Sequence, residues 1–249
     1  MNKKCVLITG ASIGLGSEIA RVFASNNYNI IITYLTHKNE ALKLKKELEN
    51  KYNINVLCIK CDISKEKDII DLKNKVINSF NKIDVLVNNA SISNDTLFED
   101  KSKEIFMKIL EVNLVGTFLI SKYFGDLMME YKSGNIINIS STNGIDTYYE
   151  YSIDYDASKA GVINLSHNLA NHYAPYIRVN TICPGWINTP MNKNMDKSFK
   201  KQEEEKILLK RFAEPKEIAE LVYFVGSEKA SYINDSVIRI DGGKNVKFK

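Results

Sequence analysis

Tyr155 and Lys159, four positions apart, could together carry acid–base chemistry. On a helix, residues four apart lie on one face, so the two side chains would be neighbours. A free tyrosine has a pKa near ~10 and is a poor base at neutral pH, whereas a nearby cation favours its phenolate. Hydride reduction of a carbonyl needs a proton donor at the oxygen, where negative charge develops. Tyr155 is the candidate for that donor.

The residues ahead of this pair supply candidate partners. A predicted strand at 135–140 runs into Ser140-Ser141, and either hydroxyl could orient a substrate oxygen. Alone, a tyrosine and a lysine at this spacing are usually an ordinary surface pair, and the serines favour the chemical interpretation. Further tyrosines lie between the serines and the pair: Tyr148, Tyr149 and Tyr151. They form either a packed aromatic loop or the wall of a substrate pocket.

A glycine-rich turn follows the first predicted strand. Gly10, Gly14 and Gly16 are spaced GxxxGxG between a predicted strand at 5–9 and a predicted helix at 12–25. Glycines let the backbone turn tightly and let a pyrophosphate approach, and the helix N-terminus supplies N–H donors. Such turns often only join a strand to a helix. The position of this one, directly after the first strand, favours dinucleotide binding.

Short apolar strands alternate with helices along the chain, without a repeat or a linker. Further strands are predicted at 30–33, 56–61, 83–88, 135–140, 178–182 and 237–240, and further helices from 64 to about 80 and at 39–52, 102–132, 156–173 and 215–225. This alternation indicates parallel strands joined by helical crossovers. The strands are near-continuous Ile, Val and Leu runs, as expected where helices cover both faces. The sequence predicts a doubly wound parallel α/β sheet (a Rossmann fold) in a single domain over residues 1–249, with its ligand beyond the carboxyl ends of the strands.

The composition excludes several classes of protein. With 249 residues, 44% hydrophobic and 26% charged, the chain is neither disordered nor collagen-like. No apolar run approaches the roughly 20 residues that span a bilayer. The N-terminal apolar stretch is too short for a secretory signal. We therefore expect a cytoplasmic protein that does not bind a membrane. The net charge of +4 comes from lysines interleaved with acids, which argues against a nucleic-acid partner. Cys58 and Cys61 form a CxxC, but within a predicted strand they would point to opposite faces, and the three histidines add no cluster, so no metal is expected.

The order of the motifs resembles the short-chain dehydrogenase/reductase family over nearly the whole chain. With Thr9 the glycine turn reads TGxxxGxG, and Tyr155 with Lys159 reads YxxxK. The other landmarks, in chain order, are Asp62, Asn88-Asn89-Ala90, Asn113, Ser140-Ser141, Pro184-Gly185, Thr189 and Asp241-Gly242-Gly243. The chain departs from the family pattern at Ser91 and at Asn234-Asp235, where relatives commonly have glycine.

The resemblance implies a catalytic set of four residues, Asn113, Ser141, Tyr155 and Lys159. Ser141 would position the carbonyl, and Tyr155 would donate the proton. Lys159 would lower the pKa of the tyrosine and bind the nicotinamide ribose, and Asn113 would hold a proton-relaying water. Ser141 is preferred to Ser140 because its separation from Tyr155 is closer to that common in relatives.

The resemblance also implies a nicotinamide dinucleotide site. Asp62 would bind the adenine, Asn88 and Ala90 the adenosine ribose, and Ile187 and Thr189 the carboxamide. Besides Tyr155 and Lys159, the expected contacts are Gly10, Ser12, Ile13, Gly14, Gly16, Tyr34, His37, Lys38, Asp62, Ile63, Asn89, Ala90, Pro184, Gly185, Ile187 and Thr189. An NAD site usually has a carboxylate after the second strand, but residues 33–38 contain none. His37 and Lys38 could instead face a 2′-phosphate, which favours NADP(H) over NAD(H). Ile13 argues against NADP(H), because NADPH-using relatives often have a basic residue at this position.

The substrate is the least determined property. The stretch 211–219 resembles 3-oxoacyl-[acyl-carrier-protein] reductases, which would mean an acyl-thioester substrate, an acyl carrier protein partner and a place in fatty acid biosynthesis. Lys132 fits a basic docking patch for that carrier, but residues 174–177 lack the second basic residue. The alternatives are a sugar or small-alcohol dehydrogenase and, since fold alone does not prove activity, a non-catalytic dinucleotide-binding regulator.

Two further expectations concern mobility and assembly. The polar stretch 190–212 is predicted to be a lid over the substrate. Relatives assemble through the helices at 102–132 and 156–173, so a homotetramer or a homodimer is expected. Four apolar residues on those helices could be core or interface: Phe118, Ile120, Leu165 and Leu169.

Overall fold

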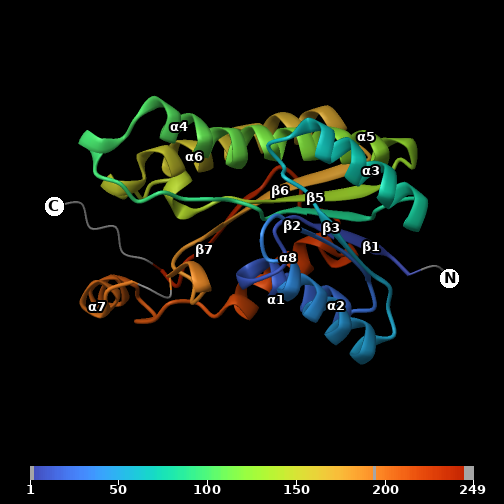
Figure 1. Ribbon diagram of the computed structural model, residues 1–249, viewed down its shortest axis with the longest axis horizontal. Helices are drawn as coiled ribbons and strands as arrows, with labels where there is room; N and C mark the ends of the chain where they lie inside the picture. Colours follow the sequence, from blue (N-terminus) through green and yellow to red (C-terminus); the bar gives the residue numbers. More distant parts are fainter. Residues whose placement is uncertain (1–2, 193–194, 244–249) are drawn as a thin grey trace.

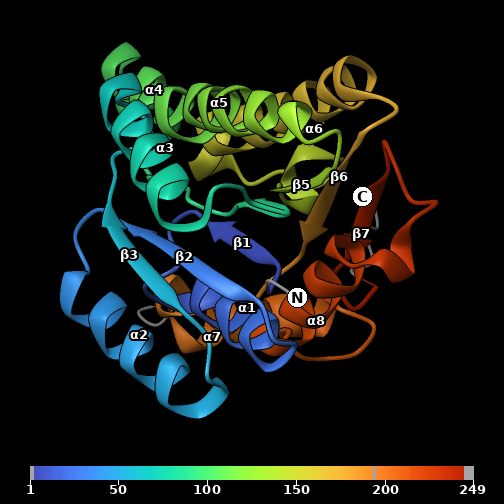
Figure 2. The same ribbon diagram turned by 90° about the vertical axis from the view of Figure 1, so that its right-hand side faces the viewer.

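A computed structural model describes residues 3–192 and 195–243 and contains one parallel sheet of seven strands. Their order across the sheet is β3-β2-β1-β4-β5-β6-β7. Figure 2 shows β3 and β7 at the two opposite edges. The strands are β1 (Cys5–Ile8), β2 (Asn29–Tyr34), β3 (Val56–Lys60), β4 (Val85–Asn88), β5 (Gly134–Ile139), β6 (Ile177–Pro184) and β7 (Val237–Ile240).

Helices cover both faces of the sheet (Figure 1). One layer contains α1 (Gly14–Ser25), α2 (Lys38–Tyr52) and α8 (Pro215–Gly226). The other contains α3 (Glu66–Phe80), α4 (Lys103–Leu110), α5 (Thr117–Glu130) and α6 (Ile153–Tyr173). These layers and the all-parallel pairing confirm the predicted doubly wound Rossmann fold in a single domain.

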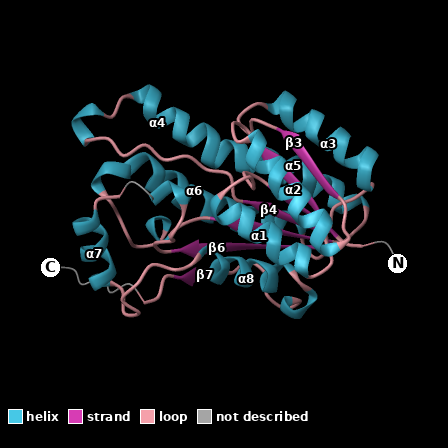
Figure 3. Cartoon of the chain, turned by 60° about the horizontal axis from the view of Figure 1, so that its bottom comes forward, coloured by secondary structure: helices cyan, strands magenta, loops and turns pink. Residues whose placement is uncertain are grey.

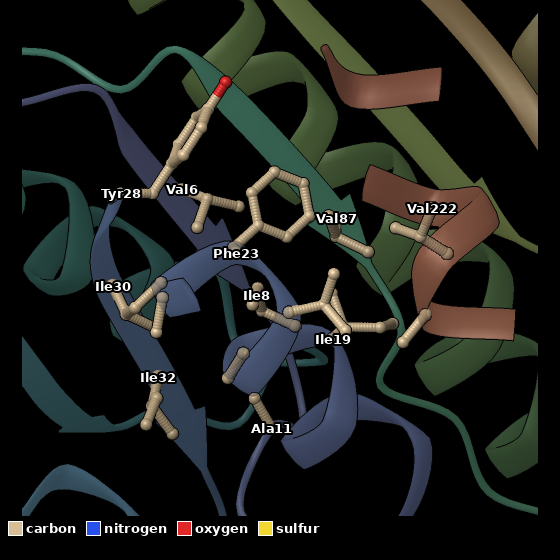
Figure 4. Packing of buried hydrophobic residues seen from close by; sticks show 14 of the residues in the cluster. Val6, Ile8, Ala11, Ile19, Phe23, Tyr28, Ile30, Ile32, Val87 and Val222 are labelled. Atoms are coloured by element: carbon tan, nitrogen blue, oxygen red, sulfur yellow. The ribbon is translucent and has the colours of Figure 1, made fainter. Parts of the chain in front are cut away.

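Alternation along the strands sends side chains into two separate cores. Val6 and Ile8 of β1 pack with α1 and α8, whereas Leu7 between them packs with α5. In Figure 4, Phe23 of α1 lies between Val6 and Val87. Its ring meets those of Tyr28 and Tyr223 edge-on, at centroid distances of 5.1 and 5.3 Å. Burial of each such side chain contributes about 1.5–3 kcal/mol, so the strand periodicity itself fixes the sheet between its helices.

The sheet reverses its winding at β1, which places the ligand site. β1 pairs with β2 on one side and with β4 on the other, both in parallel. The crossovers therefore diverge from the carboxyl end of β1, and in sheets of this type ligands bind outside the strand ends at such a point. Both the glycine turn and Asn89 lie at this edge.

Most predicted helices differ from the structure by one or two residues at an end, and two differ by more. The helix predicted at 102–132 is α4, a π-helix over Glu111–Gly116, and α5. The helix predicted at 156–173 begins three residues earlier, at Ile153, so Tyr155 lies in its first turn. No residue pattern indicated the first difference, because a π-turn has no composition of its own.

The predicted lid contains a helix that the sequence analysis did not assign. α7 (Lys197–Lys206) lies at the end of the molecule opposite the N-terminus, apart from both helical layers (Figure 1, Figure 3). Residues 193 and 194 of the predicted lid lie outside the described residues.

None of the described helices is both long and apolar enough to cross a membrane. Within the described residues, no three His, Cys, Asp or Glu side chains are grouped as a metal site.

Candidate active site

The glycine turn after β1 is shaped so that side chains are excluded from it. Gly10 and Gly14 have φ of +62° and +60°, a conformation that strongly favours glycine. A Cβ on Gly16 would lie 2.6 Å from the side-chain nitrogen of Asn89. α1 begins at Gly14, and its N-cap Ile13 makes no side-chain capping bond to the first-turn N–H groups. These N–H groups and the open backbone fit a dinucleotide pyrophosphate.

The end of β4 holds this turn in place. Thr9 Oγ1 accepts hydrogen bonds from the N–H groups of Asn89 and Ala90, each at 3.0 Å. The Asn89 amide donates to the carbonyls of Thr9 and Gly10, at 2.9 and 3.1 Å. Asn88 points away into the core, where its amide donates to Ser121 and Asn138. Asn89 and Ala90 thus border the cradle, and Asn88 supports the sheet beneath it.

The connection from β2 to α2 would border the adenosine ribose. Tyr34 ends β2 and is buried, and the exposed His37 and Lys38 are the N-cap and first residue of α2. His37 Nδ1 lies 3.0 Å from Thr36 Oγ1. Asp62, after β3, accepts hydrogen bonds from the N–H and hydroxyl of Ser64, at 3.0 and 2.7 Å. Ile63 beside it is buried.

The segment after β6 lies at the same edge of the sheet. Pro184 ends β6, and the Gly185 N–H donates to the Ile240 carbonyl at 3.0 Å. Ile187 forms a parallel bridge with Ala213, so the chain is fixed on both sides of the predicted lid. A Cβ on Gly14 would lie 3.8 Å from Thr189 Cβ, which places Thr189 against the glycine turn.

Tyr155 and Lys159 lie one turn apart on α6 and face each other. Lys159 Nζ is 5.3 Å from the centre of the Tyr155 ring and donates to the Ile139 carbonyl at 2.9 Å. Lys159 is 3% exposed, and this burial lowers its pKa to about 8. Burial raises the pKa of Tyr155 to about 12, against the effect of a hydrogen bond with Ser141. Tyr155 is therefore a neutral phenol at pH 7, a form that can donate a proton.

The geometry separates the two candidate serines. Ser140 is buried, and its hydroxyl donates to the Lys159 carbonyl at 2.8 Å. Ser141 is half-buried; its hydroxyl accepts from the Asn143 N–H at 3.2 Å, donates to Asn143 Oδ1 at 3.4 Å, and lies close enough to Tyr155 to lower the pKa of that phenol. Ser141 is thus next to the phenol, whereas Ser140 supports the helix that holds it.

Asn113 lies in the π-helix beside this set, and its side chain makes three hydrogen bonds. Its Oδ1 accepts from the Ile92 N–H, and its Nδ2 donates to the Ile92 carbonyl, both at 2.9 Å. Nδ2 also donates to Ser158 Oγ at 3.0 Å, directly before Lys159. Asn113 therefore ties the segment after β4 to the catalytic turn of α6.

Sequence reasoning missed Asp156, which folds the loop over the site. Its carboxylate accepts from the Asn143 amide at 2.7 Å, the Ser152 hydroxyl at 2.9 Å and the Tyr149 N–H at 3.0 Å. Through Asn143 it also fixes Ser141. An acid directly after Tyr155 was the available signal, but its partners are set by the loop conformation.

An aromatic cluster joins the loop before α6 to the predicted lid. Tyr149 lies 5.1 Å from Tyr151 and 6.0 Å from Phe199 of α7, between ring centres. Trp186 stacks on Phe212 at 5.4 Å and meets Phe199 edge-on at 6.2 Å. Trp186 Nε1 also donates to Glu203 of α7 at 2.9 Å. Tyr149 and Tyr151 are therefore part of a packed wall that includes the lid, and the sequence analysis missed Phe199 and Trp186.

A Rossmann sheet with a glycine cradle and a Ser/Tyr/Lys set at its carboxyl edge defines a class of nicotinamide-dependent oxidoreductases. A family model described as "Enoyl-(Acyl carrier protein) reductase" matches residues 10–245. The chain belongs to the short-chain dehydrogenase/reductase family, and it is an NAD(P)-dependent oxidoreductase that interconverts carbonyl and alcohol groups.

Named relatives cover almost the whole chain. The 3-oxoacyl-[acyl-carrier-protein] reductase FabG of Aquifex aeolicus is 36% identical over 96% of this chain and 96% of its own. The acetoacetyl-CoA reductase of an Acinetobacter species is 34% identical over 97% of each chain. Among solved structures, L-sorbose reductase from Gluconobacter frateurii, complexed with NADPH and L-sorbose, superposes with a TM-score of 0.91 at 26% identity, covering 100% of this chain and 98% of the other.

Proposed function

We propose that the protein reduces the 3-oxo group of an acyl thioester to a hydroxyl group, with NADPH as reductant. The arrangement of Tyr155, Ser141 and Lys159 carries this proposal: a neutral phenol lies beside a serine hydroxyl that lowers its pKa, and a lysine lies beside its ring. The names of the relatives at 34–36% identity support a thioester substrate and a place in fatty acid biosynthesis.

Each member of the set has a distinct task. Ser141 and Tyr155 hold the substrate oxygen, and the bound nicotinamide supplies the hydride. As negative charge develops on that oxygen, Tyr155 transfers its proton to it. The Lys159 ammonium stabilises the phenolate that remains, and it replaces that proton through water held beside Asn113. Asp156 keeps Ser141 in place through Asn143.

The start of α2 supports NADPH rather than NADH. β2 ends at Tyr34, and the residues from 35 to 38 carry no carboxylate that would compete with a 2′-phosphate. His37 and Lys38 are exposed where helix N–H groups also favour an anion. Gly10, Ser12, Ile13 and Gly14 would hold the pyrophosphate, and Thr189 would close over it.

An acyl carrier protein is the proposed macromolecular partner of the thioester. Lys132 would contribute to its docking, and its Nζ lies 5.4 Å from the centre of the Tyr176 ring. This contact joins Lys132 to the stretch in which a second basic residue was expected and not found. A single lysine gives weaker steering toward an acidic partner than a pair would. A coenzyme A thioester is therefore tested beside the carrier thioester.

Reduction of a sugar or small ketone is the second candidate. The likeness to L-sorbose reductase favours it, as do acids near the phenol: Asp156 and Asp95 each raise the pKa of Tyr155 further. Acidic surroundings suit a neutral, hydroxyl-rich substrate better than an anionic one.

The deciding experiment follows the absorbance of NADPH, and separately of NADH, with purified protein. Acetoacetyl-CoA, a 3-oxoacyl carrier thioester and L-sorbose are the substrates, and Tyr155→Phe is the control. Oxidation of NADPH by the thioesters, lost in Tyr155→Phe although that variant still binds NADPH, is the expected result. A protein that binds the nucleotide but oxidises it only with L-sorbose contradicts the thioester proposal and supports the second candidate.

We also propose that the chain assembles as a homotetramer or a homodimer through α5 and α6. Ile120 and Leu169 are buried in the core, and Leu165 packs against it. Phe118 on α5 is 41% exposed and is available to a second copy. Light scattering should give a mass above one chain for the wild type and a reduced mass for Phe118→Asp. A monomeric wild type contradicts the proposal.

A further inference from the structure

One ion pair lies buried beside the active site. Lys101 Nζ is 2.9 Å from Asp154 Oδ1 and 3.0 Å from Oδ2. Their side chains are only 4% and 0% exposed. Among the ion pairs found in the described ranges 3–192 and 195–243, this is the one in which both side chains are so deeply buried. Its position therefore needs a physical reason.

Net stability is a poor reason for such a pair. Removing two charges from water costs free energy that their attraction repays only with good geometry, and an apolar pair of similar volume is often as stable. A buried pair does fix the groups around it, because each charge needs its partner. What matters is which groups this pair holds.

On one side the pair holds the backbone of the catalytic tyrosine. Asp154 Oδ1 also accepts a hydrogen bond from the Tyr155 N–H at 2.9 Å. Tyr155 lies in the first turn of α6, where backbone N–H groups have no partner within the helix. The Asp154 carboxylate satisfies this donor, and Lys101 neutralises the carboxylate.

On the other side the pair holds the connection between β4 and α4. Lys101 Nζ also donates to the Asn94 carbonyl, so the lysine closes the segment 94–101 on itself. The same segment is joined to the chain before α6 by a backbone hydrogen bond from the Thr96 N–H to the Tyr151 carbonyl, at 3.1 Å. Asp95 within it lies close enough to Tyr155 to raise the pKa of that residue. The segment thus borders the space where the substrate carbonyl must lie.

We propose that Lys101 and Asp154 are positioning residues, which lock the backbone of Tyr155 and the segment 94–101 into one arrangement around the substrate. The proposal rests on the role of Tyr155 as proton donor. A misplacement of about 1 Å in a reacting group can slow a reaction by about 100-fold. Loss of the lock should therefore reduce kcat more than it changes the affinity for NADPH.

A double-mutant cycle tests this. Lys101→Met leaves a buried carboxylate without its cation, and Asp154→Asn leaves a buried ammonium without its anion. The double variant Lys101→Met/Asp154→Asn removes both charges, and the asparagine Oδ1 can still accept from the Tyr155 N–H. We expect each single variant to lose about 10- to 100-fold in kcat with a nearly unchanged Kd for NADPH. We expect the double variant to be no slower than the slower single variant, because either substitution alone already breaks the lock.

Lys4→Met is the matched control. It removes a lysine from an exposed ion pair with Glu228, directly before β1 and so at the opposite edge of the sheet. Its kcat should equal that of the wild type. Unchanged kcat in both folded single variants, or a double variant whose loss is the product of the two single losses, would overturn the proposal. Should a single variant fail to fold, the double variant and the wild type still give the comparison, and a double variant that folds and keeps the wild-type kcat counts against the lock.

A measurement that needs no substrate distinguishes failure of this inference from failure of the proposed function. Amide hydrogen exchange at Tyr155 should be faster than in the wild type in all three variants, and no faster in the double variant than in the faster single one. If the wild type reduces no carbonyl, the proposed function fails while this exchange pattern still tests the lock. Equal protection of the Tyr155 amide in all four proteins overturns the lock whatever the activity.

Discussion

At the scale of residues, the site works by giving two neighbouring groups opposite pKa shifts. Burial disfavours the charged form of both, so it raises the pKa of Tyr155 to about 12 and lowers that of Lys159 to about 8. The phenol therefore stays protonated at pH 7, and the lysine is still mainly an ammonium there but loses its proton near pH 8. The sequence predicted this pairing from a spacing of four residues, but not the burial that sets both shifts.

Burial of Lys159 should lower the free energy of unfolding at neutral pH. The pKa of Lys159 is 10.5 in the unfolded chain and about 8 in the folded protein, so folding below pH 8 buries a charged ammonium group. A shift of this size corresponds to about 3 kcal/mol, and loss of the bond to the Ile139 carbonyl offsets roughly 1 kcal/mol of it. Lys159→Met should therefore unfold at higher denaturant concentration at pH 7 while losing activity.

The sign of the pH dependence checks this account. Because the folded pKa is depressed, the wild type gains stability as pH rises from about 8 to 10.5, and the advantage of Lys159→Met shrinks over that range. Urea unfolding of both proteins at pH 7 and pH 10 measures it. An equal stability difference at both pH values contradicts the assignment of the shift to Lys159.

The two serines should differ when each is replaced by alanine. Ser141→Ala removes the hydroxyl beside Tyr155, and kcat should fall by about 10- to 1,000-fold with little change in stability. Ser140→Ala leaves the Lys159 carbonyl without its side-chain donor, and the free energy of unfolding should fall by roughly 1 kcal/mol. Steady-state kinetics and urea unfolding distinguish the two. A larger loss of kcat in Ser140→Ala would reverse the assignment.

At the scale of elements, the sequence predicted what is repetitive and missed what is irregular. The strands and most helices follow from apolar periodicity. The π-helix at Glu111–Gly116 does not, because it depends on contacts from elsewhere: the Asn113 amide pairs with Ile92, and a Cβ on Gly116 would lie 2.9 Å from Ile63. The Asp156 network is likewise built from residues that meet only after the loop has folded.

The helix of the predicted lid offers a test at this scale. Phe199 is the residue of α7 whose ring contacts both Tyr149 and Trp186. Phe199→Ala should detach the lid from the aromatic wall, and the KM of the carbonyl substrate should rise by about 3- to 30-fold, since an interaction of roughly 1–2 kcal/mol is lost. Lys201→Ala, at an exposed position of the same helix, is the control. An equal KM in the two variants would show that α7 does not border the substrate.

At the scale of the whole molecule, the alternation of strand and helix was enough to predict a parallel sheet covered on both faces. The order of its strands was not predicted, because local periodicity does not say which strands become neighbours. That order matters for the site: β1 pairs with both β2 and β4, which brings Gly10 within contact of Ala90 and Gly14 within contact of Thr189. Residues up to 179 positions apart thus lie at one edge of the sheet.

Because the proposed nucleotide site is assembled from connections that follow several strands of one sheet, nucleotide binding should stabilise the entire fold. A ligand at 100 times its Kd adds about 2.7 kcal/mol, which for a chain of this size corresponds to roughly 5–10 °C in Tm. NADPH should give this shift at concentrations where NADH gives less. Leu35→Asp places a carboxylate directly after β2, at a position 49% exposed, and should reverse the order of the two nucleotides. Thermal unfolding with each nucleotide at equal concentration measures both effects, and an equal shift by NADH and NADPH in the wild type would contradict the proposed preference for NADPH.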